Sequence, residues 1–324
     1  MSSFAYVEIR RRRDCRLSSS QEEVDLSHVV TCVEPGRNDV VATRLGDHVY
    51  WLSNNTYDAA RDLLGASAYR GYEGASFGVA KGVWLVEGEP LSVGPPVGAP
   101  RDREYVLIET KWGKENGIDP FVVESDFVFK GFLGKYIEIG RVVKYRYFLA
   151  PYKKDGTPLT LSELQKTWLW KNYLSNKSVQ QVLRSSSTHA KKEWWHIERM
   201  TPKAVKRFKV VWRDVADRFI PAVEATGAVA EHSAHYIAVN TLEEAYYLLA
   251  VLLAPQINAV IREISSWVGH VEPNFITYFN IPRYQANCDT HKRLAELGKK
   301  IHEEGVNDEI VKIIQTLVKE LRCR

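Results

Sequence analysis

The sequence lacks the short motifs that mark many common enzymes. It holds no GxGxxG fingerprint after a strand, no GxxxxGK[ST] phosphate loop, no GxSxG turn and no HExxH zinc motif. The glycines between residues 71 and 82 match none of these spacings and instead predict tight turns and close backbone approach. These absences argue against a dinucleotide-dependent enzyme, a P-loop NTPase, a serine hydrolase of that type and a zinc protease.

Cysteine clusters and long apolar runs are also missing. The four cysteines, Cys15, Cys32, Cys288 and Cys323, form no CxxC and no Cys/His cluster at zinc spacing. We therefore expect reduced structural thiols, no bound metal and no cofactor. The longest apolar run, residues 245–254, is too short to span a bilayer, and no apolar signal segment follows the N-terminal arginines. These features predict a cytoplasmic protein with no membrane contact.

Positive charge is present in two blocks, although the net charge is only +4. Residues 130–154 hold seven Lys/Arg and one acidic residue, and residues 181–218 hold ten Lys/Arg and four acidic residues. The first block also contains tyrosines, and the second contains tryptophans. Clustered cations interleaved with aromatic side chains are typical of a surface that binds a phosphate backbone, although they also occur as ordinary solvated faces.

The candidate DNA-binding residues come from these blocks. The lysines and arginines would neutralise phosphates or read guanine edges, and the aromatic residues would stack on an unpaired base. For Trp194 and Trp195 the alternative is that at least one lies in the core, and Arg213 could be an ordinary strand end. The full candidate set is Lys135, Arg141, Lys144, Arg146, Lys153, Lys154, Lys191, Lys192, Trp194, Trp195, His196, Arg199, Lys203 and Arg213.

One alternative is catalytic. In the stretch "VLIETKWGK", Glu109 and Lys111 would alternate on one face of a predicted strand. Metal-dependent nucleases present a Glu-x-Lys pair in this way, with the carboxylate on magnesium and the lysine orienting the attacking water. This pattern is common by chance, so a nuclease remains an alternative to simple binding.

The predicted elements are mixed. Short strands dominate the first hundred residues, including one at residues 83–86, and a helix is expected at 56–65. Further strands are expected in "VVWRDV" and "HYIAV". A helix should begin at Thr160 or Ser162, and Thr241 should cap a long apolar helix that Pro255 kinks or splits. Two amphipathic helices form the tail, so the predicted fold class is α+β.

Six blocks occur in the order found in TaqI-like specificity domains of adenine-N6 DNA methyltransferases and type IIG restriction-modification enzymes, which this chain resembles. The blocks span residues 65–284 and are "SAYRGYEGASFGVAKGVWLV", "VESDFVFKGFLGKYIEIGRVVKYRYFLAPY", "DGTPLTLSELQ", "WWHIERMTPKAVKRFKVVWRDVADRFIPAVEATGAVAEHSAHYIAV", "EEAYYLLAVLLAPQINAVIREIS" and "NFITYFNIPRY". The chain departs from the family at Ala254-Pro255, where Asn-Ser is usual, and at Glu224, where aspartate is usual.

The catalytic part of that family has no counterpart in this sequence. The one Pro-Pro, in "GPPV", lacks the residues that the methyltransferase motif needs on both sides, and no glycine-rich loop for S-adenosylmethionine precedes the recognition region. The resemblance therefore implies sequence-specific binding of double-stranded DNA without methyl transfer by this chain. A separate methyltransferase or nuclease subunit would supply the chemistry, or the chain would act alone as a recognition module.

The resemblance also implies a division of the chain. It predicts a β-rich lead-in over residues 1–64, a strand-rich target-recognition domain with packed helices over 65–286, and a helical tail over 287–324. The tail helices would either cover the core of the domain or dock a partner chain, including a second copy. Binding of RNA or of single strands remains an alternative because the aromatic content is high.

Overall fold

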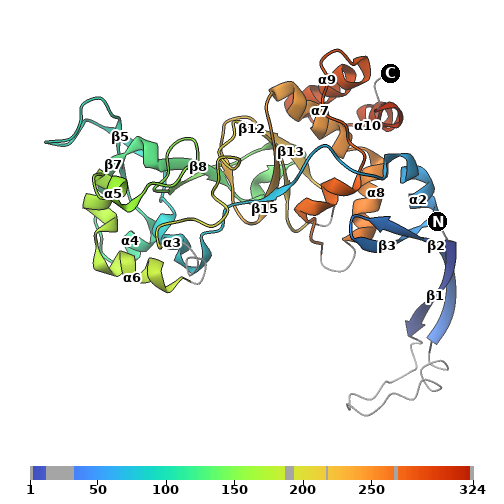
Figure 1. The fold of residues 1–324 in the computed structure, drawn as a ribbon, viewed down its shortest axis with the longest axis horizontal. Coiled ribbons are helices and arrows are strands. Elements are labelled where there is room, and N and C mark those ends of the chain that lie inside the picture. Colours follow the sequence, from blue (N-terminus) through green and yellow to red (C-terminus); the bar gives the residue numbers. More distant parts are fainter. Residues whose placement is uncertain (1–2, 12–32, 187–192, 217, 266–268, 322–324) are drawn as a thin grey trace, which may run out of the picture.

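The computed structural model describes residues 3–11, 33–186, 193–216, 218–265 and 269–321. The fold is mixed α+β, as the sequence predicts. Figure 1 shows an elongated molecule with a β-sheet in its middle, one lobe carrying α3 to α6, and another carrying α7 to α10. The N-terminal hairpin projects from the second lobe (Figure 1).

The central sheet has six strands in the order β4-β15-β12-β13-β10-β9. Its pairs are antiparallel except for β10 with β13. The strands are β4 (Tyr72–Glu73), β9 (Ile137–Glu138), β10 (Gly140–Val142), β12 (Phe208–Arg213), β13 (Pro221–Glu224) and β15 (Ala234–Val239). The strands expected in "VVWRDV" and "HYIAV" are thus confirmed.

The central sheet separates two hydrophobic cores. Successive side chains of a strand point to opposite faces, and β12 follows this rule. Val211 packs into the first core, whereas Val210 and Trp212 pack into the second. One continuous sheet therefore supports both lobes.

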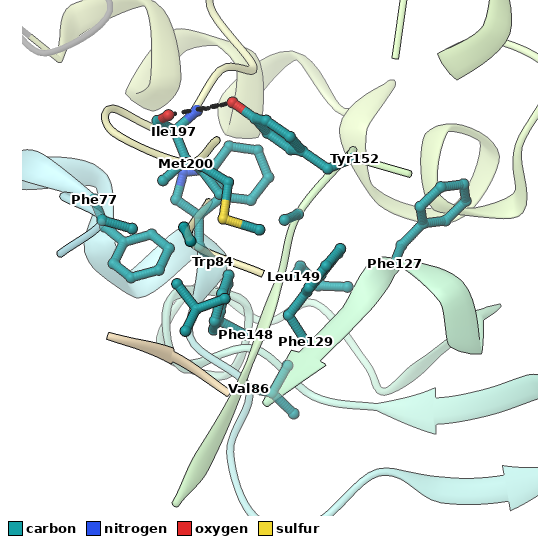
Figure 2. Close-up of a cluster of buried hydrophobic side chains, with 14 of the residues drawn as sticks. Phe77, Trp84, Val86, Phe127, Phe129, Phe148, Leu149, Tyr152, Ile197 and Met200 are labelled. Atoms are coloured by element: carbon teal, nitrogen blue, oxygen red, sulfur yellow. Dashed lines mark hydrogen bonds between the residues drawn. The ribbon is translucent and has the colours of Figure 1, made fainter. Parts of the chain in front are cut away.

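The first core lies under two small sheets, β5-β6-β7 and β11-β8-β14, and a group of helices. In Figure 2, Phe77, Trp84, Phe148 and Tyr152 gather around this core, and the Tyr152 hydroxyl accepts a hydrogen bond from the Ile197 N–H at 2.9 Å. The elements are α3 (Lys81–Trp84), β5 (Leu91–Val93), β6 (Tyr105–Ile108), α4 (Lys111–Glu115), β7 (Phe121–Glu124), β8 (Val128–Phe132), η4 (Gly134–Tyr136), β11 (Arg146–Leu149), α5 (Leu161–Leu164), η5 (Trp170–Leu174), α6 (Lys177–Ser185) and β14 (Val229–Ala230).

The second core lies among the C-terminal helices and the N-terminal sheet β1-β2-β3. Its helix α7 is capped by Thr241, whose side chain accepts from the Glu244 N–H, and α8 starts at Pro255, as predicted. The elements are β1 (Ser3–Arg11), β2 (Val33–Leu45), β3 (His48–Ser53), α2 (Asn54–Ala60), η1 (Arg61–Leu63), α7 (Leu242–Leu252), α8 (Pro255–Ile264), η7 (Pro273–Tyr278), α9 (Asp289–Glu304), α10 (Asp308–Leu317) and η8 (Val318–Glu320).

The two tail helices α9 and α10 contribute to this second core. Leu294, Ile301, Ile310 and Ile314 are buried in it. Gly298 allows α9 to approach α7 so closely that a Cβ there would lie 1.9 Å from the Tyr246 carbonyl oxygen. The tail therefore covers the core of the protein; docking of a partner chain on its outer side remains a prediction.

No single helix in the described part of the chain is long and apolar enough to cross a membrane. Helices α7 and α8 pass that test only as a pair, and they are bent by 68° where they meet. The split at Pro255 produces this bend, because proline cannot donate the backbone hydrogen bond that a continuous helix needs.

Three local expectations are wrong. The strand expected at residues 83–86 is not formed, because residues 83 and 84 end helix α3 and Leu85 and Val86 make only isolated bridges. The strand expected through Glu109 and Lys111 stops at Ile108, because the Thr110 side chain accepts from the Gly113 N–H and starts α4. Cys288 is disulfide-bonded and is not a reduced thiol.

Candidate nucleic-acid interface

Four of the candidate cations are paired with carboxylates. Arg146 binds the buried Glu231, and Arg199 binds Glu73. Lys153 Nζ lies 3.0 Å from a Glu163 oxygen, and Lys154 Nζ lies 3.6 Å from an Asp126 oxygen. The Lys153 and Lys154 pairs are exposed, so breaking them costs little free energy. The Arg146 pair is buried.

The aromatic candidates lie in the first core. Trp194 and Trp195 are both buried, and the Trp195 indole N–H donates to the Leu159 carbonyl at 3.0 Å. The His196 ring packs against the rings of Trp195 and Tyr152. These rings are structural, so stacking on a base would require them to leave the core. Lys191 and Lys192 lie outside the described residues.

Arg213 ends β12 with its side chain half-buried. Its guanidinium donates two hydrogen bonds, of 2.9 and 2.6 Å, to the Ile137 carbonyl oxygen at the start of β9. The side chain thereby ties β12 to β9 across the sheet. A guanidinium has five N–H groups, so Arg213 has further N–H groups that could donate to a phosphate or a base.

Three lysines rest instead on tyrosine rings. Lys130 Nζ lies 3.8 Å from the centroid of the Tyr145 ring, and the Nζ atoms of Lys135 and Lys144 lie 5.4 and 5.5 Å from the centroid of Tyr136. None of these lysines has a carboxylate within 4 Å among the described residues. We call these five residues the tyrosine–lysine surface.

The fold of β8, η4 and the turn after β10 places this surface. The Val143 N–H donates to the Tyr136 carbonyl at 2.9 Å, which sets the turn carrying Lys144 beside Tyr136. The Tyr145 ring packs edge-on against Phe132 of β8. Burial raises the pKa of Tyr145 to about 12, so its hydroxyl stays neutral and hydrogen-bonds Thr226. Packing and this hydrogen bond therefore fix the Tyr145 ring.

Two further cations lie next to this surface. Lys206 and Arg207 are exposed, and they pass beside Gly227, one residue from the Thr226 that bonds Tyr145. Below them, the buried Lys209 and Glu224 lie opposite each other on β12 and β13, with Lys209 Nζ 3.4 Å from a Glu224 oxygen. Burial lowers the pKa of Lys209 to about 8, and the nearby Glu224 opposes that shift.

A similar arrangement occurs at the β4 edge of the sheet. Lys203 Nζ lies 4.4 Å from the centroid of the Tyr72 ring, and the Arg70 guanidinium carbon lies 5.7 Å from it. On β10, Arg141 is exposed and makes no ion pair within the described chain. Lys135, Arg141, Lys144 and Lys203 are thus exposed candidates without an ion pair within 4 Å among the described residues, and Arg141 lies opposite Glu138 in the β9–β10 register.

The nuclease geometry is not formed. Lys111 begins helix α4, so it does not share a strand face with Glu109, and Glu109 pairs with Lys114 at 3.2 Å. Among the described residues, no group of three His, Cys, Asp or Glu side chains could hold a metal ion.

The candidate set omitted Lys130, Tyr136 and Tyr145. A sequence signal for the two tyrosines exists, because Lys135-Tyr136 and Lys144-Tyr145 are both Lys-Tyr dipeptides. Lys130 has no such signal, since it reaches Tyr145 only after β8 pairs with β11.

Comparison with protein-family models and with curated protein sequences found no match to this chain.

Proposed function

We propose that the protein binds double-stranded DNA in the cytoplasm as a target-recognition module, with the tyrosine–lysine surface contacting the phosphate backbone. The observation that carries the proposal is the set of three lysines held on tyrosine rings without an acidic partner in the described chain. A lysine that binds a phosphate releases condensed counterions, and this release drives association. Lysines already paired with carboxylates would first have to give up that partner.

The resemblance to TaqI-like specificity domains supports duplex DNA over other polyanions, and it supports a role beside a separate methyltransferase or nuclease subunit. Phosphate contacts alone position a protein and carry no sequence information. We assign sequence reading to exposed cations next to the surface, Arg141, Lys206 and Arg207, because arginine and lysine hydrogen-bond guanine edges in the major groove.

A salt titration tests the phosphate contacts. The affinity for a fixed duplex is measured by fluorescence anisotropy at several salt concentrations, for the parent chain and for the triple variant Lys130→Gln, Lys135→Gln, Lys144→Gln. Each phosphate contact contributes about 0.9 to the slope of log K against log salt. We expect the slope to fall by roughly 2.7 if each lysine holds one phosphate.

The matched control is Lys114→Gln with Lys153→Gln, which removes two exposed lysines that lie outside the tyrosine–lysine surface and pair with Glu109 and Glu163. Its slope should change much less. An unchanged affinity and slope in the triple variant would contradict the proposal. Competition with RNA and single strands at fixed salt completes the test, and a clear preference for RNA would overturn the choice of duplex DNA.

A further inference from the structure

A second aromatic and basic site lies away from the tyrosine–lysine elements, between α5 and α6. A cavity of about 460 Å³ opens there, lined mainly by Lys166, Thr167, Trp168, Trp170, Lys171 and, from the loop after β5, Gly98. This volume falls within the range of roughly 300–1,000 Å³ typical of small-ligand sites. A single nucleotide fits that size class.

The walls of the cavity combine ring faces with positive charge. Trp168 and Trp170 are both half-buried, and Lys171 Nζ lies 4.1 Å from the centroid of the Trp168 ring. The described lining residues include Lys166 and Lys171 but no acidic residue. An aromatic face suits a base, and two lysines suit its phosphate.

The backbone around the two tryptophans donates hydrogen bonds to a buried carboxylate. The Trp168 and Leu169 N–H groups donate to the two oxygens of the buried Glu124, at 2.9 and 3.2 Å. Residues Trp170–Leu174 form a π-helix, a rare element that is frequent at functional sites. The backbone that carries Trp168 and Trp170 is therefore fixed by hydrogen bonds.

The loop at the rim carries an exposed apolar residue. Val97 is 100% exposed, follows Pro95 and Pro96, and precedes Gly98 of the cavity lining. Proline restricts the loop backbone. An apolar tip beside an aromatic pocket is the kind of feature with which proteins separate stacked bases.

We propose that this cavity binds one unstacked nucleotide, with the base against Trp168 and Trp170 and a phosphate on Lys166 or Lys171. The inference rests on the proposed DNA-binding function and adds a nucleotide pocket to it. The nucleotide comes either from a single strand or from a base extruded out of a duplex, and both present the same base and phosphate to the pocket.

Photocrosslinking tests the contact directly. Oligonucleotides carrying 5-iodouracil, either single-stranded or at one position of a duplex, are irradiated with the protein, and the crosslinked peptide is mapped by mass spectrometry. We expect crosslinks at Trp168 or Trp170. Crosslinking by the single strand alone assigns the pocket to unpaired DNA, and crosslinking by the duplex assigns it to an extruded base.

Affinity measurements give the second readout. Trp168→Leu keeps apolar cover but removes the ring, and Lys171→Gln removes one charge. Each should weaken binding of the crosslinking oligonucleotide, the first by roughly 5- to 150-fold, as expected for the loss of one base–aromatic stack. The control is Lys177→Gln, an exposed lysine at the start of α6 that does not line the cavity. Thermal unfolding confirms that each variant is folded.

The two proposals fail differently. If duplex binding shows the expected salt slope but neither tryptophan crosslinks and Trp168→Leu binds normally, the pocket inference is overturned and the proposed function stands. If the triple lysine variant binds duplex as well as the parent while the tryptophans still crosslink, the phosphate surface is wrong and the pocket stands. If no nucleic acid binds, both are overturned.

Discussion

Replacing Lys209 by methionine should destabilise the protein by about 3–5 kcal/mol, because it leaves the carboxylate of Glu224 buried without its counter-charge. Both side chains are 0% exposed. Lys209 Nζ donates to the Lys206 carbonyl oxygen. Glu224 accepts from the N–H groups of Thr226 and Gly227, at 2.8 and 3.2 Å. The pair therefore connects the segment that carries Lys206 and Arg207 with the turn that bonds Tyr145.

The pH dependence separates this pair from an ordinary packing defect. Burial lowers the pKa of Lys209 to about 8, whereas a lysine in an unfolded chain titrates near 10.4. Between these two pH values the unfolded chain holds a proton that the folded chain has released, so the stability of the parent rises with pH across this window. The gain amounts to roughly 3 kcal/mol, at about 1.4 kcal/mol for each unit of pKa difference.

Urea unfolding of the parent and of Lys209→Met, at pH 7 and at pH 10, measures both effects. The stability difference between the two should widen toward pH 10, because only the parent carries the titrating lysine and other groups cancel. The double variant Lys209→Met with Glu224→Gln removes both charges and should recover much of the loss at pH 7. A stability difference that stays constant or narrows with pH would refute the lowered pKa, and no recovery in the double variant would refute the charge pair.

Three further substitutions probe other parts of the fold. Glu231→Gln should cost about 3–5 kcal/mol in urea unfolding, because the buried Glu231 carboxylate is the counter-charge that Lys81 and Arg146 share. Gly298→Ala should lower the melting temperature, since its Cβ would lie 1.9 Å from a carbonyl oxygen of α7 and force α9 outward; an unchanged melting temperature would show that α9 shifts freely. Thr241→Ala should cost about 1 kcal/mol by removing the cap of α7, and Thr241→Ser should cost almost nothing.

Sequence patterns predicted those elements whose signals are local. The Thr160 capping box with Glu163 and the Thr241 cap are formed as expected. Each cap is a hydrogen bond between residues three apart in sequence, so it does not depend on tertiary contacts. Pro255 splits the long apolar helix for an equally local reason. The strand through Glu109 was wrong because Thr110, which fits strands by its β-branched side chain, acts here as a helix cap.

Counting charges along the chain could not predict which cations stay uncompensated, because their acidic partners are distant in sequence. Arg146 is neutralised by Glu231 and Arg199 by Glu73, and both carboxylates lie outside the two basic blocks. Lys130 and Lys144 belong to the same block as Arg146 but face tyrosine rings. A ring attracts a cation without cancelling its charge. The number of phosphates that this protein neutralises should therefore follow the lysines on rings rather than the total of lysines and arginines, and the slope of affinity against salt measures that number.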